Sequence, residues 1–227
     1  VDHFCEQGSE VYFVDIDLKG TKKLLKKIKK NKFRLPTFIE CNLLDINKLE
    51  KIIKNIITKK GPIHALVNNA ANDDRHTTDQ VDEKYWENRM AINLKHYFFA
   101  AKSVVKAMKK IKSGSIINLS SVSWMLGEGD KVVYETAKSA VVGLTRSFAK
   151  EYGKYNIRTN SVVPGSIATE RQIKYWLTPK YKKLILESQA LKRHLKPNDV
   201  AQMVMFLASD QSSGCTKQSF IVDGGIT

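Results

Sequence analysis

Short apolar runs alternate with amphipathic helical patterns along the whole chain, and this alternation restricts the fold more than any other feature. Six runs predict strands at Val11–Val14, Thr37–Cys41, Ala65–Asn68, Ser115–Leu119, Thr159–Val163 and Phe220–Val222. Helical spacing of apolar residues fills 21–31, 46–59, 79–110, 131–153, 170–190 and 197–209. Asp45 and Asn198 stand at expected N-caps. Such alternation predicts an α/β fold, a doubly wound parallel sheet flanked by helices, and one domain over 1–227.

Small or hydrogen-bonding residues follow nearly every predicted strand. They are Asp15, Asn42, the run Asn68-Asn69-Ala70-Ala71, Ser120-Ser121 and Pro164-Gly165-Ser166. In open parallel sheets, ligands bind beyond the carboxyl ends of the strands. We therefore expect the active site along this polar rim.

A serine, a tyrosine and a lysine give the rim its chemistry. Tyr134 and Lys138 are four residues apart in YETAK and share one face of the predicted helix. A phenol has a pKa near 10, so it becomes a base at neutral pH only if a nearby cation favours the phenolate. Ser121 ends a strand and can point into the same space. On these residues alone, an alternative stays open in which Tyr134 packs between helices and Lys138 faces solvent.

Further motifs resemble the short-chain dehydrogenase/reductase family over almost the whole chain. NNAA (68–71) is similar to the family's NNAG, and Asn93 in MAINLKHYFFAA to its helix asparagine. GSIINLSS (114–121) precedes YETAK at the family's spacing, and PGSIAT (164–169) resembles its PGxxxT segment. LASDQSSGCTKQSFIVDGG (207–225) resembles the family's carboxyl terminus. The resemblance implies a Rossmann-like fold and a nicotinamide-dependent oxidoreductase.

The resemblance also implies roles for the catalytic residues. Tyr134 is expected to be the general base for alcohol oxidation, and Ser121 to hydrogen-bond the substrate oxygen. Lys138 is expected to lower the tyrosine pKa and to hold the nicotinamide ribose. Asn93 is expected to hold a water that links Lys138 to solvent.

The cofactor is expected to be NAD. Asp15 ends the second strand of the family's sheet, where a carboxylate accepts from both ribose hydroxyls and repels a 2′-phosphate. Ile16, Asp17 and Leu18 follow it, with no immediate Arg or Lys. Asn42 replaces the family's aspartate beside the adenine, and Ala71 replaces the glycine of NNAG. The other expected cofactor contacts are Leu43, Asn69, Ala70, Tyr134, Lys138, Pro164, Gly165, Ile167 and Thr169, together with Ile16.

The variable loops resemble those of bacterial sugar dehydrogenases of the D-xylose or L-arabinose 1-dehydrogenase type. The loops are NDDRH (72–76), SVSWMLGEGD (121–130) and ERQIKYWLTP (170–179). The expected reaction is oxidation of an aldose at C1 to a lactone, and the alternative is a 3-oxoacyl or general alcohol/ketone oxidoreductase. The expected substrate contacts are Ser121, Ser123, Trp124, Tyr134, Arg171, Gln172 and Trp176. Trp124 is equally expected as core packing, and 73–76 is expected to be a local salt-bridged loop rather than a substrate ligand set.

Composition argues against several other kinds of protein. The formal charge of +15 is concentrated in the lysine-rich stretch 19–34, where Leu24, Leu25 and Ile28 form one apolar stripe. No aromatic residue is interleaved to stack on bases, so we expect a solvated helix face and no nucleic-acid partner. No apolar run approaches the roughly 18 residues of a membrane span. Three scattered cysteines favour a reducing cytoplasm, and neither they nor His76 has metal-ligand spacing, so no metal is expected.

The start of the chain predicts the middle of a nucleotide-binding unit. A helical pattern ends near Gly8 and runs into the strand that ends at Asp15, whereas the family has an earlier strand and a TGxxxGxG turn. We expect a fragment that lacks both, which leaves a gap in the sheet and removes the phosphate cradle. A cofactor-free interaction or oligomerisation subunit is the alternative of another class. Helices 79–110 and 131–153 resemble the surfaces by which the family forms dimers and tetramers, so a homo-oligomer is expected.

Overall fold

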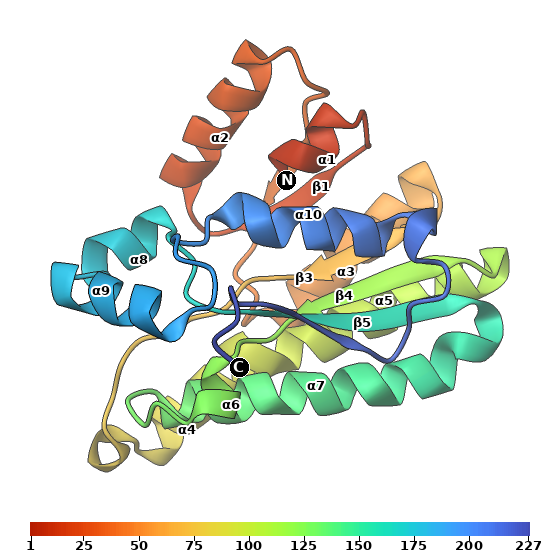
Figure 1. Cartoon of the computed structure of the whole chain (residues 1–227). Helices are drawn as coiled ribbons and strands as arrows, with labels where there is room; N and C mark the ends of the chain where they lie inside the picture. The colour runs from red at the N-terminus through yellow and green to blue at the C-terminus, as the bar shows by residue number, and fades with distance from the viewer.

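The computed structural model describes residues 1–227 and is an α/β structure (Figure 1). Its strands are β1 (Tyr12–Asp15), β2 (Thr37–Glu40), β3 (Ala65–Asn68), β4 (Gly114–Leu119), β5 (Ile157–Pro164) and β6 (Ser219–Val222). Its helices are α1 (Asp2–Glu6), α2 (Leu18–Lys30), α3 (Ile46–Lys60), α4 (Glu83–Met90), α5 (His96–Ile111), α6 (Ser123–Leu126), α7 (Val132–Tyr152), α8 (Glu170–Tyr175), α9 (Pro179–Ser188) and α10 (Pro197–Ala208). No helix has the length and apolarity that a bilayer span requires.

All strand pairs are parallel, but the strands form two ladders. β1 pairs with β2, and the other ladder has the order β3-β4-β5-β6. No ladder joins β1 to β3. This separation agrees with the gap that was expected in the sheet beside the strand that ends at Asp15. The predicted fold class is confirmed, with the strands divided between these two ladders.

Helices cover both faces of the larger sheet. α5 and α7 pack on one face, with α3 against α5, and α10 packs on the other with α1 beside it (Figure 1). The larger apolar core joins α3, α5 and α7 to the sheet through residues such as Val104, Met108 and Ile116. A smaller core under α10 centres on Ile117, Val162 and Leu207. The lysine-rich α2 buries Ile28 and exposes its lysines, as the apolar stripe predicted.

Two long predicted helices are interrupted. The stretch 79–110 contains α4, a π-helical turn at Ala91–Lys95 and α5. The stretch 170–190 divides into α8 and α9, because Thr178 accepts from Tyr181 N and Pro179 opens a new helix. The short helix α6 was not predicted.

The two predicted N-caps had different outcomes. Asp45 caps α3 by accepting from Lys48 N at 2.9 Å, as expected. Asn198 is not a cap, because α10 already begins at Pro197. The carboxylate of Asp199 instead accepts from Lys196 N at 2.7 Å, which satisfies a donor at the start of the helix.

Candidate active site

The predicted serine, tyrosine and lysine lie on one wall of a cavity beyond the carboxyl ends of β4 and β5. Ser121 follows β4, while Tyr134 and Lys138 lie one turn apart near the start of α7. All three line a cavity of about 630 Å³, which also reaches Pro164 and Gly165 after β5. The polar rim expected from the strand ends is therefore a real concave site.

Gly165 allows the β5 end to lie close to the carboxyl terminus of the chain. A Cβ atom at this position would lie 2.7 Å from Cα of Asp223. The carboxylate of Asp223 in turn accepts from the backbone N–H groups of Gly225, Ile226 and Thr227. These bonds fix the terminal segment against the cavity, which Ile226 helps to line.

Lys138 is fully buried, and its ammonium group is held by two oxygens. It donates to the carbonyl oxygen of Leu119 at 2.7 Å and to the hydroxyl oxygen of Tyr97 at 3.1 Å. Burial lowers the pKa of Lys138 to about 7, against an opposing effect of the Asp73 charge. Tyr97 was not among the expected site residues, although it lies one helical turn after Asn93.

The expected effect of Lys138 on Tyr134 is absent from this structure. Burial raises the pKa of Tyr134, a hydrogen bond with Ser121 lowers it, and the charge of Asp73 raises it. Lys138 Nζ is 5.6 Å from the centroid of the Tyr134 ring and donates to Leu119 and Tyr97 instead. Lys138 therefore does not contribute to lowering the pKa of Tyr134 in this arrangement of side chains, and its expected role in catalysis stays a prediction.

Ser123 holds Ser121, the candidate catalytic serine, in place. Its hydroxyl donates to Ser121 Oγ at 3.0 Å, and its backbone N–H donates to the same oxygen at 3.2 Å. With both bonds accepted, Ser121 can use its own proton toward Tyr134 or a substrate oxygen. Ser123 also lines the cavity, as expected of a substrate contact.

Asn93 lies in the π-helical turn between α4 and α5 and is fully buried. Its amide donates to Asn72 O at 3.0 Å and accepts from Asn72 N at 2.8 Å. His96, one turn further, bonds the carbonyl oxygens of Ala70 and Ile92, and burial lowers its pKa to about 4. Asn93 thus fixes the loop that follows β3 against the site.

The expected cofactor residues fall into two groups. Asn69, Ala71, Tyr134, Lys138, Pro164, Gly165, Ile167 and Thr169 line the cavity. Asp15, Ile16, Asn42 and Leu43 lie at the ends of β1 and β2, outside the cavity lining, and Ala70 contributes its carbonyl to His96.

These residues fit a nicotinamide dinucleotide. Asp15 is exposed, and only its Oδ1 is engaged, by the N–H groups of Ile16 at 2.7 Å and Asp17 at 2.9 Å. Its Oδ2 has no partner in the chain and can accept from a ribose hydroxyl. Asn42 Oδ1 accepts from Leu44 N at 3.0 Å and keeps a second lone pair for an adenine amine.

Of the expected substrate side chains beyond the catalytic set, only Ser123 and Gln172 line the cavity. Arg171 points to Asp74 at 2.6 Å and Asp73 at 3.4 Å. Trp124 and Trp176 are outside the cavity lining, each with a buried ring N–H that has no partner. The Arg75 guanidinium lies 5.2 Å from the centroid of the Trp176 ring, so this ring faces a cation.

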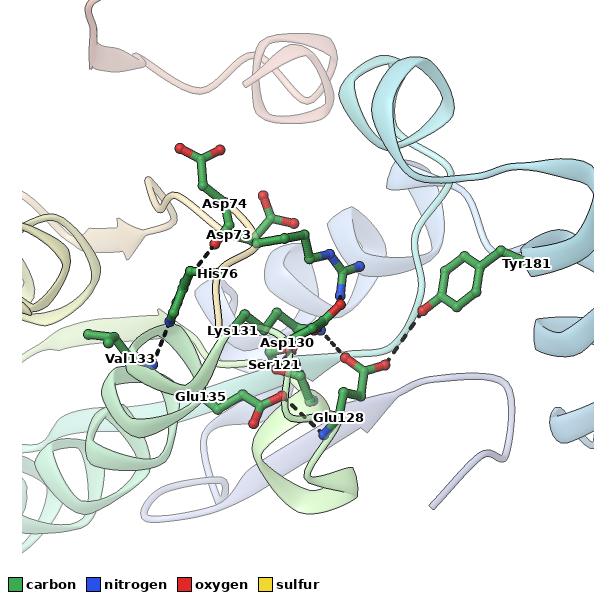
Figure 2. Close-up of polar contacts among 12 residues, drawn as sticks. Asp73, Asp74, His76, Ser121, Glu128, Asp130, Lys131, Val133, Glu135 and Tyr181 are labelled. Carbon is green, nitrogen blue, oxygen red and sulfur yellow. Dashed lines mark hydrogen bonds and ion pairs between the residues drawn. The ribbon is translucent and has the colours of Figure 1, made fainter. Parts of the chain in front are cut away.

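The loop 73–76 is salt-bridged, but its partners are not local. Arg75 pairs with Asp130, and Asp74 pairs with Arg89 at 3.2 Å and with Arg171. Asp73 accepts from Gln172 Nε2 at 2.5 Å and lines the cavity, so it is also a site residue. Figure 2 shows this loop beside Ser121 and the segment 128–131. The carboxylates there pair with Lys131 and Arg75, the protein's own cations.

Comparison with known proteins places the chain in a family. Residues 1–227 match the family model described as Enoyl-(Acyl carrier protein) reductase. The D-xylose 1-dehydrogenase of Caulobacter vibrioides is 40% identical over 222 residues, which cover 98% of this chain and 87% of that protein. A probable galactose dehydrogenase of Rhizobium meliloti is 38% identical over 226 residues, which cover 100% of this chain and 88% of that protein.

A crystal structure shows the same fold. The protein comes from Sinorhizobium meliloti 1021 and was assigned to the short-chain alcohol dehydrogenases. It superposes on this chain with a TM-score of 0.91 at 27% sequence identity. The superposition covers 99% of this chain and 89% of the other chain. The chain belongs to the short-chain dehydrogenase/reductase family, which confirms the resemblance seen in its motifs. It is an oxidoreductase of that family.

Proposed function

We propose that this chain oxidises the C1 hydroxyl of an aldose to the lactone and transfers the hydride to NAD. The observation that carries the proposal is the hydrogen-bonded pair Asp73 and Gln172, which lines the same cavity as Tyr134. A carboxylate and an amide at this position suit a small substrate rich in hydroxyl groups. The names of the two curated relatives, a xylose and a galactose dehydrogenase, support the same class of substrate.

The catalytic side chains act on the C1 hydroxyl in this proposal. Ser121 donates to the substrate oxygen, and its own oxygen is fixed by Ser123. Tyr134 removes the hydroxyl proton as the hydride leaves C1, so it must be ionised at that moment. Since burial raises its pKa, the phenolate needs nearby positive charge, and a protonated Lys138, whose Nζ lies 5.6 Å from the ring centroid, would supply it once the substrate and cofactor are bound.

The cofactor contributes a nicotinamide C4 that accepts the hydride. Asp15 would hold the adenosine ribose, and its charge favours NAD over NADP. Lys138, Thr169 and Asn69 line the part of the cavity where the nicotinamide ribose and amide would lie.

We also propose that the chain forms a homo-oligomer and works in the cytoplasm. Trp86 on α4 and Phe98 on α5 are 41% and 42% exposed, and such large apolar side chains suit a subunit interface. Three free cysteines, two of them buried, suit a reducing compartment.

A panel of substrates tests the proposal. Formation of NADH or NADPH is measured with D-xylose, L-arabinose, D-galactose and D-glucose, each with NAD and with NADP. Tyr134→Phe is the inactive control. We expect at least one aldose to be oxidised and the Tyr134→Phe rate to fall about 10²–10⁴-fold. No oxidation of any pentose or hexose would refute the proposal. Faster reduction of an acetoacetyl thioester than oxidation of any sugar would favour a 3-oxoacyl reductase instead.

A further inference from the structure

His76 is a buried histidine that uses three polar groups to join separate elements. It ends the loop after β3 and is 6% exposed. Its backbone N–H donates to Asp130 O at 2.8 Å, just before α7. Its ring packs edge-on against Tyr85 of α4, with centroids 5.0 Å apart.

The ring nitrogen Nε2 accepts a hydrogen bond from Val133 N at 3.3 Å (Figure 2). Val133 is the second residue of α7, where a backbone N–H has no partner within the helix. An N-cap side chain normally accepts from this position, but the N-cap Lys131 provides no such bond. The missing cap is therefore supplied by a residue 57 positions earlier in the chain.

The other ring nitrogen agrees with this assignment. Nδ1 lies 3.1 Å from Asp74 O and 3.0 Å from the Tyr85 hydroxyl oxygen. Because Nε2 accepts, a neutral ring carries its proton on Nδ1, where both neighbours can accept it. The single Nδ1 proton is then donated to one of these oxygens or shared between them, while Nε2 stays free to accept from Val133 N.

We propose that His76 is a positioning residue for Tyr134, acting through the first turn of α7. Tyr134 follows Val133 directly, so the bond to His76 fixes the backbone from which the tyrosine projects. The same loop also carries Asn72, which is bonded to Asn93, and Asp73, which lines the cavity. His76 itself is outside the cavity lining, so the role assigned to it is positioning and not catalysis.

This inference rests on the proposed function for its kinetic effect but not for its structural basis. A displacement of about 1 Å in a catalytic group can cost about 10²-fold in rate. We therefore expect loss of the Val133 bond to lower kcat while the KM for the sugar changes little.

Two amide substitutions separate the two ring nitrogens. Glutamine can place its Oε1 near the position of Nε2 and keep the bond to Val133. The asparagine amide reaches only as far as the position of Nδ1. It can therefore keep the hydrogen bond to Asp74 O but loses the bond from Val133 N. We expect His76→Asn to lower kcat at least tenfold, because a displacement of about 1 Å in a catalytic group can cost about 10²-fold. The KM for the sugar and the affinity for the cofactor should be nearly unchanged. His76→Gln is expected to stay close to the wild type, and the exposed His64→Asn serves as the control.

Amide hydrogen exchange at Val133 gives a readout that needs no enzymatic activity. In the cofactor-free chain we expect this exchange to accelerate about three- to tenfold in His76→Asn and to remain slow in His76→Gln. Unchanged exchange in His76→Asn, or equal kcat losses in both variants, would overturn the proposal. A wild-type chain that oxidises no aldose would refute the proposed function alone, and the exchange comparison would still decide whether His76 holds α7.

Discussion

The Lys138 ammonium group donates a 2.7 Å hydrogen bond to the carbonyl oxygen of Leu119, the last residue of β4. This bond joins α7 to the strand that Ser121 follows. It also removes the ammonium group from water, which is why the pKa of Lys138 falls to about 7.

The lowered pKa of Lys138 predicts how stability depends on pH. Between about pH 7 and its ordinary value of 10.5, the unfolded chain binds a proton at this lysine that the folded chain does not. The free energy of unfolding should therefore rise with pH through this window, and the contribution should be flat below it. We expect Lys138→Met to remove that rise, measured by urea unfolding of the cofactor-free chain. The exposed Lys150→Met is the control, and a Lys138→Met curve parallel to the wild type would contradict the prediction.

Substitution of Asp73 tests the electrostatics of the cavity. Burial raises the pKa of Tyr134, and the Asp73 charge raises it further, so Asp73→Asn should lower it. The rise of kcat with pH should then occur at lower pH, and the KM for the sugar should increase because an acceptor is weakened. Asp74 also pairs with Arg171, and with Arg89, but it lies outside the cavity lining. Asp74→Asn should therefore leave the pH profile in place. Identical profiles for the two variants would argue against a role for Asp73.

Asp15 determines the predicted preference for NAD. Its free oxygen would bond the ribose with the strength of a charged hydrogen bond, so Asp15→Ala should weaken NAD binding roughly 10- to 100-fold. Binding of NADP should weaken less, because the charge that repels a 2′-phosphate is also removed. Titration of both cofactors by calorimetry measures the two effects. Equal losses for NAD and NADP would mean that Asp15 does not set the preference.

Substitution of Gly165 tests how closely the end of β5 packs against the backbone of Asp223. An alanine there would press its Cβ against the Asp223 backbone at 2.7 Å, so Gly165→Ala should destabilise the fold by about 1–3 kcal/mol. At Gly143, in the middle of α7, an added Cβ would meet no neighbouring atom within 4 Å, and Gly143→Ala should stabilise by roughly 0.5–1 kcal/mol. Thermal unfolding compares the two. A Gly165→Ala chain as stable as the wild type would mean that the terminal segment moves aside freely.

Sequence patterns predicted the strands and located the candidate catalytic residues because both depend on local order. Apolar runs that stop at polar residues locate strand ends, and Ser121, Tyr134 and Lys138 follow from spacing along the chain. The break between α8 and α9 was also present in the sequence, since Thr178-Pro179 is a helix start. Helical spacing of apolar residues continues on both sides of Thr178-Pro179, so one helix over 170–190 was predicted instead of two.

Other features depend on contacts between distant segments and have no local signal. The bond between Lys138 and Tyr97 joins residues 41 positions apart, and it redirects the ammonium group away from Tyr134. The partners of Arg171 lie nearly 100 positions earlier, in a loop that was expected to pair within itself. The π-helical turn around Asn93 likewise follows no spacing rule that the sequence displays.

The helix α8 is held beside the cavity by charge on two sides. Glu170 pairs with Lys23 of α2, and Arg171 pairs with Asp73 and Asp74. The Lys23 and Glu170 side chains are largely accessible to water, and those of Arg171 and Asp74 are partly exposed. Added electrolyte therefore screens these attractions, with a Debye length of about 10 Å at 0.1 M. Under the proposed function, the residence time of a sugar beside α8 should therefore shorten as ionic strength rises.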